Sequence, residues 1–321
     1  MSLWKINRGF LPSSDPILSL SQSYEFNRQI VVLENLSHNL SNYLEARKVR
    51  EELVFDLREL GDILPYLRSL KESDLERAML LYSSFASAYV NSFYEHTADR
   101  IPIEISIPLN FIANKLGRKP ILSYSSLVLF NWTEGGYEPL QLFCSSDFEE
   151  EIKFISFHIN MEFVFSKFIS NIFTDKSNTT KLVFLLDSIR ALQEMFFINE
   201  NMLNVITRNF DNINYEDIGI QSHVGFNIYQ SPSIWLIHKG FGLPIPDDKK
   251  MMLDYMVRQH RKVIDAFKEK CFTYFTDLDD FYDSCLREFI CFMNKYNSCV
   301  GNQKYLLNPE DYLNGGTSSS V

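Results

Sequence analysis

The apolar residues of this chain recur mainly at spacings of three and four, which is the periodicity of an amphipathic α-helix. This pattern predicts helices over 26–58, 61–95, 147–173, 179–198, 200–210, 233–241, 247–270 and 277–297. Residues 101–108 instead alternate isoleucine with proline and polar residues, which favours a short extended segment before a short helix at 109–116. Residues 211–233 are rich in Asn, Asp, Gly and Ser and predict a loop. We therefore expect a mainly α fold.

The clearest linker signal in the first half is the sequence Thr133-Glu134-Gly135-Gly136. A chain of 321 residues is long enough to form one large domain and a smaller one. We expect a small N-terminal mixed domain over 1–140 and a large all-helical domain over 141–321. The tail from residue 300 is expected to be mobile.

Charge and cysteine content narrow the class of protein. The net charge is −10 and the chain has no basic block, so nucleic acid and anionic membranes are disfavoured as partners. No apolar run reaches the roughly 18 residues of a membrane-spanning helix, and the first residues lack the apolar core of a signal peptide. Five cysteines without a CxxC pair indicate reduced thiols, so we expect a cytoplasmic protein. The spacing of Cys285, Cys291 and Cys299 fits no usual zinc pattern and favours packing roles.

One histidine stands out by its neighbours. His260 has Met256 at i−4 and Ile264 at i+4, which places all three on one face of the predicted helix. Such a residue is either a core histidine bonded to a carbonyl or a proximal ligand to haem iron. In the second case the basic flanks, Arg258 and Arg261, would be available to the haem propionates. The residues alone leave both interpretations open.

His158 shows a similar environment, with Phe154 at i−4 and Met161 at i+3. One interpretation is a buried pair with Glu162 at i+4. A second is a non-haem metal site built on the same two residues, although helical di-iron sites use Glu-x-x-His pairs from two helices and we find no such set.

Several segments, taken in order, resemble the indoleamine 2,3-dioxygenase family of haem enzymes, and together they cover nearly the whole chain. They are Arg8-Gly9-Phe10-Leu11-Pro12, Pro120-Ile121-Leu122-Ser123-Tyr124 ("P-I-L-x-Y"), Asn131-Trp132, Tyr255-Met256 with His260-Arg261, Tyr282-Asp283-Ser284-Cys285, and Gly315-Gly316-Thr317. No single segment decides the resemblance, which rests on their order and spacing.

The resemblance implies haem b as cofactor, with His260 as its proximal ligand and Arg258 and Arg261 beside it. It places His158 at the distal position, which is commonly serine in this family and histidine in the sister family of tryptophan 2,3-dioxygenases. A neutral imidazole there could accept a hydrogen bond from an indole N–H or orient oxygen.

The resemblance also implies a set of substrate-binding residues. Arg208 has the spacing of the arginine that holds the substrate carboxylate, a task that suits the planar guanidinium fork. The alternative is a surface arginine paired with Glu200 or Asp211. Tyr124, Phe154 and Leu127 would line an aromatic pocket, although each could equally be core. Thr317 would close over the substrate ammonium group unless it belongs to a disordered tail.

One departure from the family concerns the wall of the site. The family carries a glycine-rich "G-G-S-A-G-Q-S-S" stretch before the proximal helix, whereas this chain has Phe226-Asn227-Ile228-Tyr229-Gln230-Ser231-Pro232-Ser233. Because glycine lets the backbone approach a ligand closely, we expect this wall to be reshaped.

The function implied by the resemblance is dioxygenation of the indole 2,3 bond of L-tryptophan or a related indole amino acid, with O2 as co-substrate and an N-formylkynurenine-type product. One alternative is a diverged haem oxygenase of secondary metabolism that mono-oxygenates or rearranges an indole amino acid. Another is a haem-binding protein without turnover, against which the retained Arg208 argues. The sequence leaves open whether the protein is a monomer or a homo-oligomer.

Overall fold

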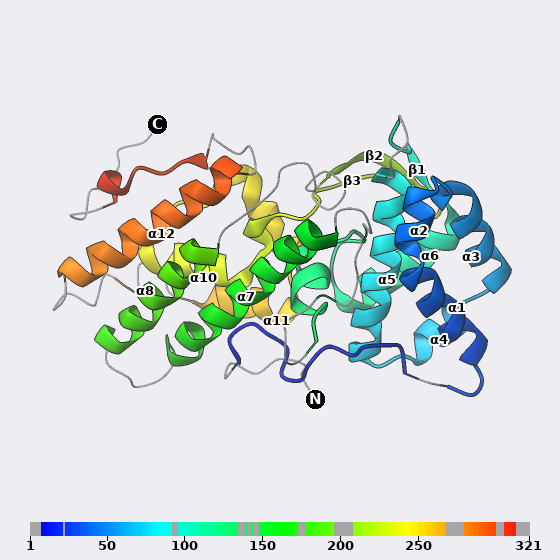
Figure 1. Ribbon diagram of the computed structural model, residues 1–321, viewed down its shortest axis with the longest axis horizontal. Coiled ribbons are helices and arrows are strands. Elements are labelled where there is room, and N and C mark those ends of the chain that lie inside the picture. Colours follow the sequence, from blue (N-terminus) through cyan, green and yellow to red (C-terminus); the bar gives the residue numbers. More distant parts are fainter. Residues whose placement is uncertain are drawn as a thin grey trace.

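The computed structural model describes residues 8–21, 23–91, 96–133, 139, 143, 148–172, 178–195, 208–267, 272, 279–299 and 305–312. Its α-helices are α1 (Asn27–His38), α2 (Leu40–Glu45), α3 (Val54–Leu60), α4 (Leu64–Ser69), α5 (Glu72–Asn91), α6 (Ile103–Leu116), α7 (Phe148–Ile172), α8 (Asn178–Met195), α10 (Pro232–Phe241), α11 (Arg258–Ala266) and α12 (Asp279–Cys299). The mainly α fold is thus confirmed. Figure 1 shows α1 to α6 gathered at one end of the molecule and α7, α8, α10 and α12 at the other.

Helix α5 is the central helix of the first group. All its residues from Asp74 to Asn91 are buried, including charged ones. A helix that is enclosed on every side must satisfy its polar groups through internal partners. Two of its charged residues, Glu76 and Arg77, have such partners, because both form buried ion pairs.

The expected extended segment over 101–108 was wrong. Only Arg100–Ile101 forms a strand, and α6 begins at Ile103 after Pro102, which occupies the position before the helix. Pro108 lies inside the helix and costs one backbone hydrogen bond. The buried face of Ile105, Leu109 and Ile112 offsets that loss.

The expected loop over 211–233 was also wrong in its first half. Strands β2 (Phe210–Tyr215) and β3 (Gly219–His223) form an antiparallel hairpin, and β1 (Arg100–Ile101) pairs in parallel with β2. An irregularity between Phe210 and Ile213 interrupts the register, and Asn212 has a φ of 56°. This bulge breaks the alternation of buried and exposed residues by which a strand is recognised in sequence.

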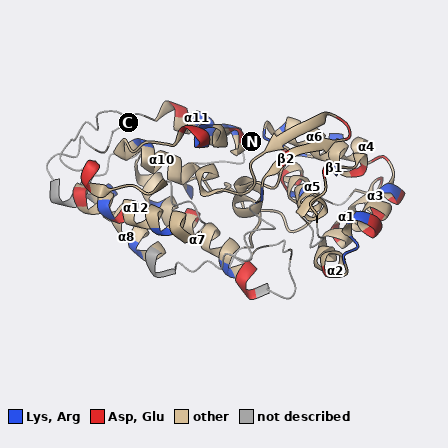
Figure 2. Cartoon of the chain, turned by 90° about the horizontal axis from the view of Figure 1, so that it is seen from above, with Lys and Arg blue, Asp and Glu red and all other residues tan. Residues whose placement is uncertain are grey.

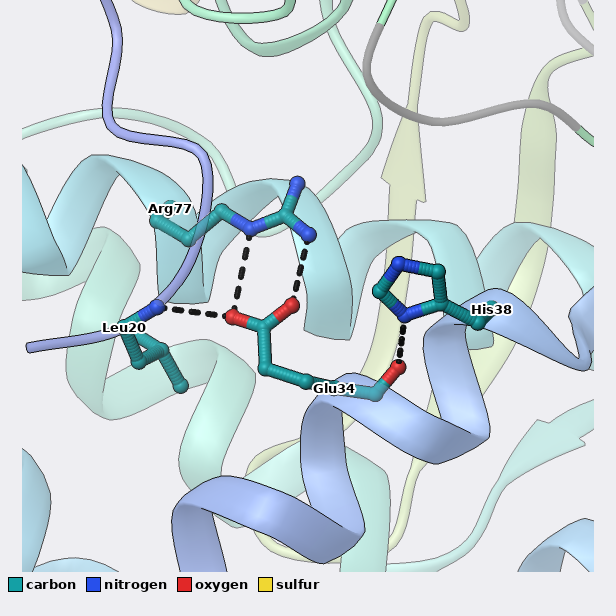
Figure 3. A network of polar contacts seen from close by, with 4 residues as sticks. All are labelled: Leu20, Glu34, His38 and Arg77. Atoms are coloured by element: carbon teal, nitrogen blue, oxygen red, sulfur yellow. Dashed lines mark hydrogen bonds and ion pairs between the residues drawn. The ribbon is translucent and has the colours of Figure 1, made fainter. Parts of the chain in front are cut away.

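The N-terminal segment connects the two groups of helices (Figure 1). Near its end, Leu20 N–H donates to Glu34 Oε1 at 2.8 Å, and the same carboxylate binds Arg77 Nη2 at 2.7 Å (Figure 3). Near its start, Gly9 has a φ of 62°, and a Cβ at this position would lie 2.7 Å from the Cα of Ser166 in α7. Only glycine therefore allows this close approach of the two backbones.

Acidic and basic side chains are interspersed along the helices rather than gathered in one basic face (Figure 2). Across the residues that the structure describes, no helix is long and apolar enough to cross a membrane. The predicted division near residue 140 stays a prediction, and the small sheet draws its strands from both sides of it.

Candidate functional site

His260 is the third residue of α11, and its exposed fraction is 2%. Its ring packs edge-on against Phe10 of the N-terminal segment, with ring centroids 5.0 Å apart. Burial lowers the pKa of His260 to about 3, and the positive charge of Arg118 acts in the same direction. The imidazole is therefore neutral at physiological pH, which is the form that binds a metal ion.

The two basic residues expected beside His260, Arg258 and Arg261, lie with it on α11, and their role toward haem propionates stays a prediction. Arg258 is exposed, and Arg261 donates through Nη2 to the Gly117 carbonyl oxygen at 2.8 Å. The residue that follows Gly117 is Arg118, whose side chain is only 1% exposed. The hydrogen bond from the Arg261 side chain to the Gly117 carbonyl thus places the buried guanidinium of Arg118 in the neighbourhood of the histidine.

His158 lies in the middle of α7 and is completely buried. Its Nδ1 is 2.8 Å from the Phe154 carbonyl oxygen, and its Nε2 is 3.1 Å from the Tyr296 hydroxyl. Because a carbonyl only accepts, Nδ1 carries the proton and Nε2 accepts from the hydroxyl. Burial lowers the pKa of His158 to about 4, so the ring is neutral. The alternative interpretation of His158 as a buried pair with Glu162 is therefore wrong, because both ring nitrogens have other partners.

Glu162 instead binds three hydroxyl groups from other parts of the chain. Tyr124 donates to Oε1 at 2.8 Å, Ser231 to Oε1 at 2.5 Å, and Ser233 to Oε2 at 2.5 Å. Ser231 is also the N-cap of α10, because its Oγ accepts from the Ile234 N–H. Burial raises the pKa of Glu162, and the three hydroxyls oppose that effect. This buried carboxyl fastens α7, α10 and the chain at Tyr124 to one another.

Aromatic side chains enclose His158 and join it to the expected pocket residues. The rings that pack around it belong to Tyr124, Phe154, Phe157, Phe226 and Tyr296. Phe226 stacks on Tyr124 with centroids 5.3 Å apart. It occupies part of the stretch that is glycine-rich in the resembled family, so a large side chain fills the space that glycine would leave open.

The other expected substrate residues have different positions. Leu127 is fully buried in the π-helical turn Ser125–Leu129, directly after Tyr124. Arg208 precedes β2 with an exposed side chain, and the contacts of the described residues do not connect it to the His158 cluster. Thr317 lies outside the described residues. The roles of these three residues therefore stay predictions.

The three cysteines considered as possible zinc ligands differ in their burial. Cys285 is buried and Cys291 is exposed, and both are free thiols, as is Cys299. Within the described ranges, no group of three or more His, Cys, Asp or Glu side chains could hold a metal ion.

A cavity of about 720 Å³ lies beside α10 and α11. Its apolar lining includes Trp235, Leu253 and Ile264, and its charged lining includes Lys239 and Asp265. Ile264 is one helical turn beyond His260 on the same face of α11. The volume is in the range of ligand pockets in other proteins.

The sequence interpretation missed four features of this region. Tyr296 and Phe226 complete the aromatic enclosure of His158, Ser231 and Ser233 satisfy Glu162, and Arg118 lies near His260. Gln230-Ser231, which matches the Gln-Ser of the family's "G-G-S-A-G-Q-S-S" stretch, was a usable signal for the serines. Neither Tyr296 nor Arg118 carried a signal, because their partners are distant in the sequence.

The donor chemistry of this region fits haem. A single neutral, buried imidazole at His260 is of the chemical type that would hold a haem iron. The buried guanidinium of Arg118 has Nε and Nη1 atoms without an acceptor in the structure described here, as expected beside an anionic group. Both ring nitrogens of His158 are already engaged, so it is not a ligand in this arrangement.

Comparison with known proteins agrees with these features. A sequence model described as "Indoleamine 2,3-dioxygenase" matches residues 3–216, a range that includes Tyr124, His158 and Arg208 and ends before α11. No curated protein matches the chain significantly. The match spans well over half of the chain, which belongs to the indoleamine 2,3-dioxygenase family of haem-dependent oxygenases.

Proposed function

We propose that this protein is a haem-dependent dioxygenase that inserts both atoms of O2 across the indole 2,3 bond of L-tryptophan or a related indole amino acid. The product would be of the N-formylkynurenine type. The observation that carries the proposal is the neutral, buried imidazole of His260 in a chain of this family. When bound, haem supplies the activation of oxygen.

The residues of this chain supply placement and exclusion of water. His260 would hold the haem iron, and the rings of Tyr124 and Phe154 would lie against an aromatic substrate. The neutral His158 offers Nε2 as an acceptor for an indole N–H if Tyr296 gives up its hydrogen bond. Arg208 would bind the substrate carboxylate once it turns inward, which is a rearrangement that substrate binding must drive.

A second candidate follows from the closed cluster around His158. Phe226 packs against both Tyr124 and His158, and Tyr296 occupies the Nε2 atom. The Phe226 ring takes up space beside His158, and the Tyr296 hydroxyl takes up the hydrogen-bond acceptor that an indole substrate would use. They favour a diverged oxygenase that acts on a different indole, or a haem protein without turnover.

The deciding experiment is aerobic incubation of the reduced, haem-loaded protein with L-tryptophan, followed by mass spectrometry of the product. A gain of two oxygen atoms supports the dioxygenase, and a gain of one supports the diverged oxygenase. Stable haem binding without any product from a panel of indole amino acids would contradict both enzyme proposals.

The proximal assignment has its own test. We expect His260→Ala to abolish stable haem binding, because the chain would lose the imidazole that would hold the haem iron. A matched control is His238→Ala, which removes another fully buried histidine from the neighbouring helix α10. A normal haem spectrum in His260→Ala, with folding confirmed by circular dichroism, would refute the assignment.

A further inference from the structure

Arg118 carries more hydrogen-bonding capacity than its surroundings satisfy. It follows α6, and its side chain is 1% exposed. Its Nη2 donates to Glu76 Oε2, whereas Nε and Nη1 have no acceptor among the described residues. A buried donor that is left unpaired is costly, and more so when it is charged.

The neighbours of Arg118 do not remove this cost. The Arg118 guanidinium lies over the Phe130 ring, with Cζ 5.8 Å from the ring centroid. Such a contact stabilises the positive charge in part. It supplies no hydrogen-bond acceptor to the N–H groups, which point outward in the guanidinium plane. Burial also raises the pKa of Glu76 to about 6, so its compensating charge is weakened.

The nearby Arg77 provides an internal comparison. It also lies in a buried ion pair, but Glu34 receives both its Nε and its Nη2, at 3.4 and 2.7 Å (Figure 3). Glu34 in turn accepts from the Leu20 N–H, so that network has a second anchor. Arg77 leaves one buried nitrogen, Nη1, without an acceptor among the described residues, whereas Arg118 leaves two, Nε and Nη1, and is the less completely satisfied of the two cations.

The location of Arg118 indicates what its missing partner is. The carbonyl of the adjacent Gly117 accepts a hydrogen bond from Arg261, the residue after His260. The positive charge of Arg118 contributes to lowering the pKa of His260. Two arginines therefore lie near His260: Arg118 is buried and paired with Glu76, and Arg261 is partly exposed with Nη1 3.8 Å from Asp254 Oδ1. Binding of a ligand near the imidazole would be favoured if the ligand had a negatively charged group.

We propose that Arg118 binds a carboxylate of the ligand that lies against His260, through the guanidinium N–H groups that Glu76 does not use. This inference rests on the proposed haem-dependent function. Two sources provide this chemistry, a haem propionate and the carboxylate of an amino acid substrate. Because Nε and Nη1 are enclosed by protein, Phe130 or another covering side chain moves aside when the carboxylate binds.

The test compares ligand affinities of Arg118→Met with those of the wild-type protein, using the haem absorption band. Arg68→Met is the matched control, since it removes one arginine charge from an exposed position. Arg118→Met alone leaves the Glu76 carboxylate buried without its ion-pair partner, which could disturb folding. The double variant Glu76→Gln/Arg118→Met controls for this effect, because it removes both charges of the buried pair. We expect Arg118→Met and the double variant to weaken carboxylate binding roughly 10- to 100-fold, with Arg68→Met unchanged.

Two pairs of probes identify the source of the carboxylate. If it is a propionate, the loss appears with haem and is absent with haem dimethyl ester. If it belongs to the substrate, haem affinity is unchanged, and the loss appears with L-tryptophan but not with tryptamine.

Equal affinities of wild-type and Arg118→Met protein for haem and for L-tryptophan would overturn this inference alone. A wild-type protein that binds neither ligand would overturn the proposed function together with the inference. Restoration of affinity in Arg118→Lys would show that a positive charge suffices and would overturn the role of the unused guanidinium N–H groups.

Discussion

Glu162 connects three parts of the chain, so its replacement gives a quantitative test of the site. In Glu162→Ala, the hydroxyls of Tyr124, Ser231 and Ser233 lose their acceptor in a region without solvent. Each net hydrogen bond contributes about 1 kcal/mol, and a buried hydroxyl left unpaired adds to the cost. We expect the free energy of unfolding to fall by about 3–5 kcal/mol.

Glu162→Gln is the informative partner of that variant. The amide oxygen keeps two of the three donors, and the amide nitrogen can donate to the third hydroxyl, so we expect a loss of about 1 kcal/mol. Because burial raises the pKa of Glu162, its contribution to stability is complete below the unfolded pKa, 4.5, and is lost as the pH rises through the folded value. Relative to wild type, Glu162→Gln should therefore become more stable with rising pH.

The assay is urea denaturation followed by circular dichroism, at pH 4.5 and at pH 8, for wild type and both variants. Equal losses in Glu162→Ala and Glu162→Gln would refute the argument from hydroxyl satisfaction. A wild-type advantage over Glu162→Gln that grows with pH would show that the ionised carboxylate is the stabilising form.

Three further predictions concern the surroundings of the site. Phe226→Ala should open the space beside His158 and lower the free energy of unfolding by about 3–5 kcal/mol, because Phe226 is only 3% exposed; unchanged stability in denaturation would mean that the ring is not part of the core. Gly9→Ala should destabilise more than Gly61→Ala, because both have positive φ but only Gly9 meets another backbone, and equal thermal shifts would contradict this. Because burial raises the pKa of Glu76 from 4.5 to about 6, ionisation of this carboxyl should lower the free energy of unfolding by about 2 kcal/mol as the pH rises through that interval. A stability difference between wild type and Glu76→Gln that does not change from pH 4 to 7 would refute this prediction.

The sequence predicted the helices that bury a regular apolar stripe. Helices α7, α8, α10 and α12 lie close to their expected bounds, and α10 ends at Gly242, whose φ is 71°. The secondary-structure predictions failed where packing or a backbone irregularity outweighed the local sequence pattern. The prolines around α6 indicated an extended segment, but burial of its apolar face outweighed them, and the bulge in β2 concealed a strand.

The candidate site was predictable only where neighbours in sequence are neighbours in space. Phe154 and His158 share one helix face, and their contact follows from the spacing. The partners of Glu162 lie up to 71 residues away and the partner of His158 lies 138 residues away. Such pairings depend on how the helices pack, which periodicity does not report.

The small sheet has a consequence for the order in which the protein is made. Within the described part of the chain, strand β1 pairs with β2 of the hairpin, and next to it the Ile103 N–H donates to Glu216, 113 residues later in the sequence. At synthesis rates of roughly 5–20 residues per second, the nascent N-terminal part waits about 6–20 s for that partner. During this interval the edge around Ile101 and Ile103 is open to other chains or to chaperones. A fragment that ended near residue 140 would keep that open edge permanently.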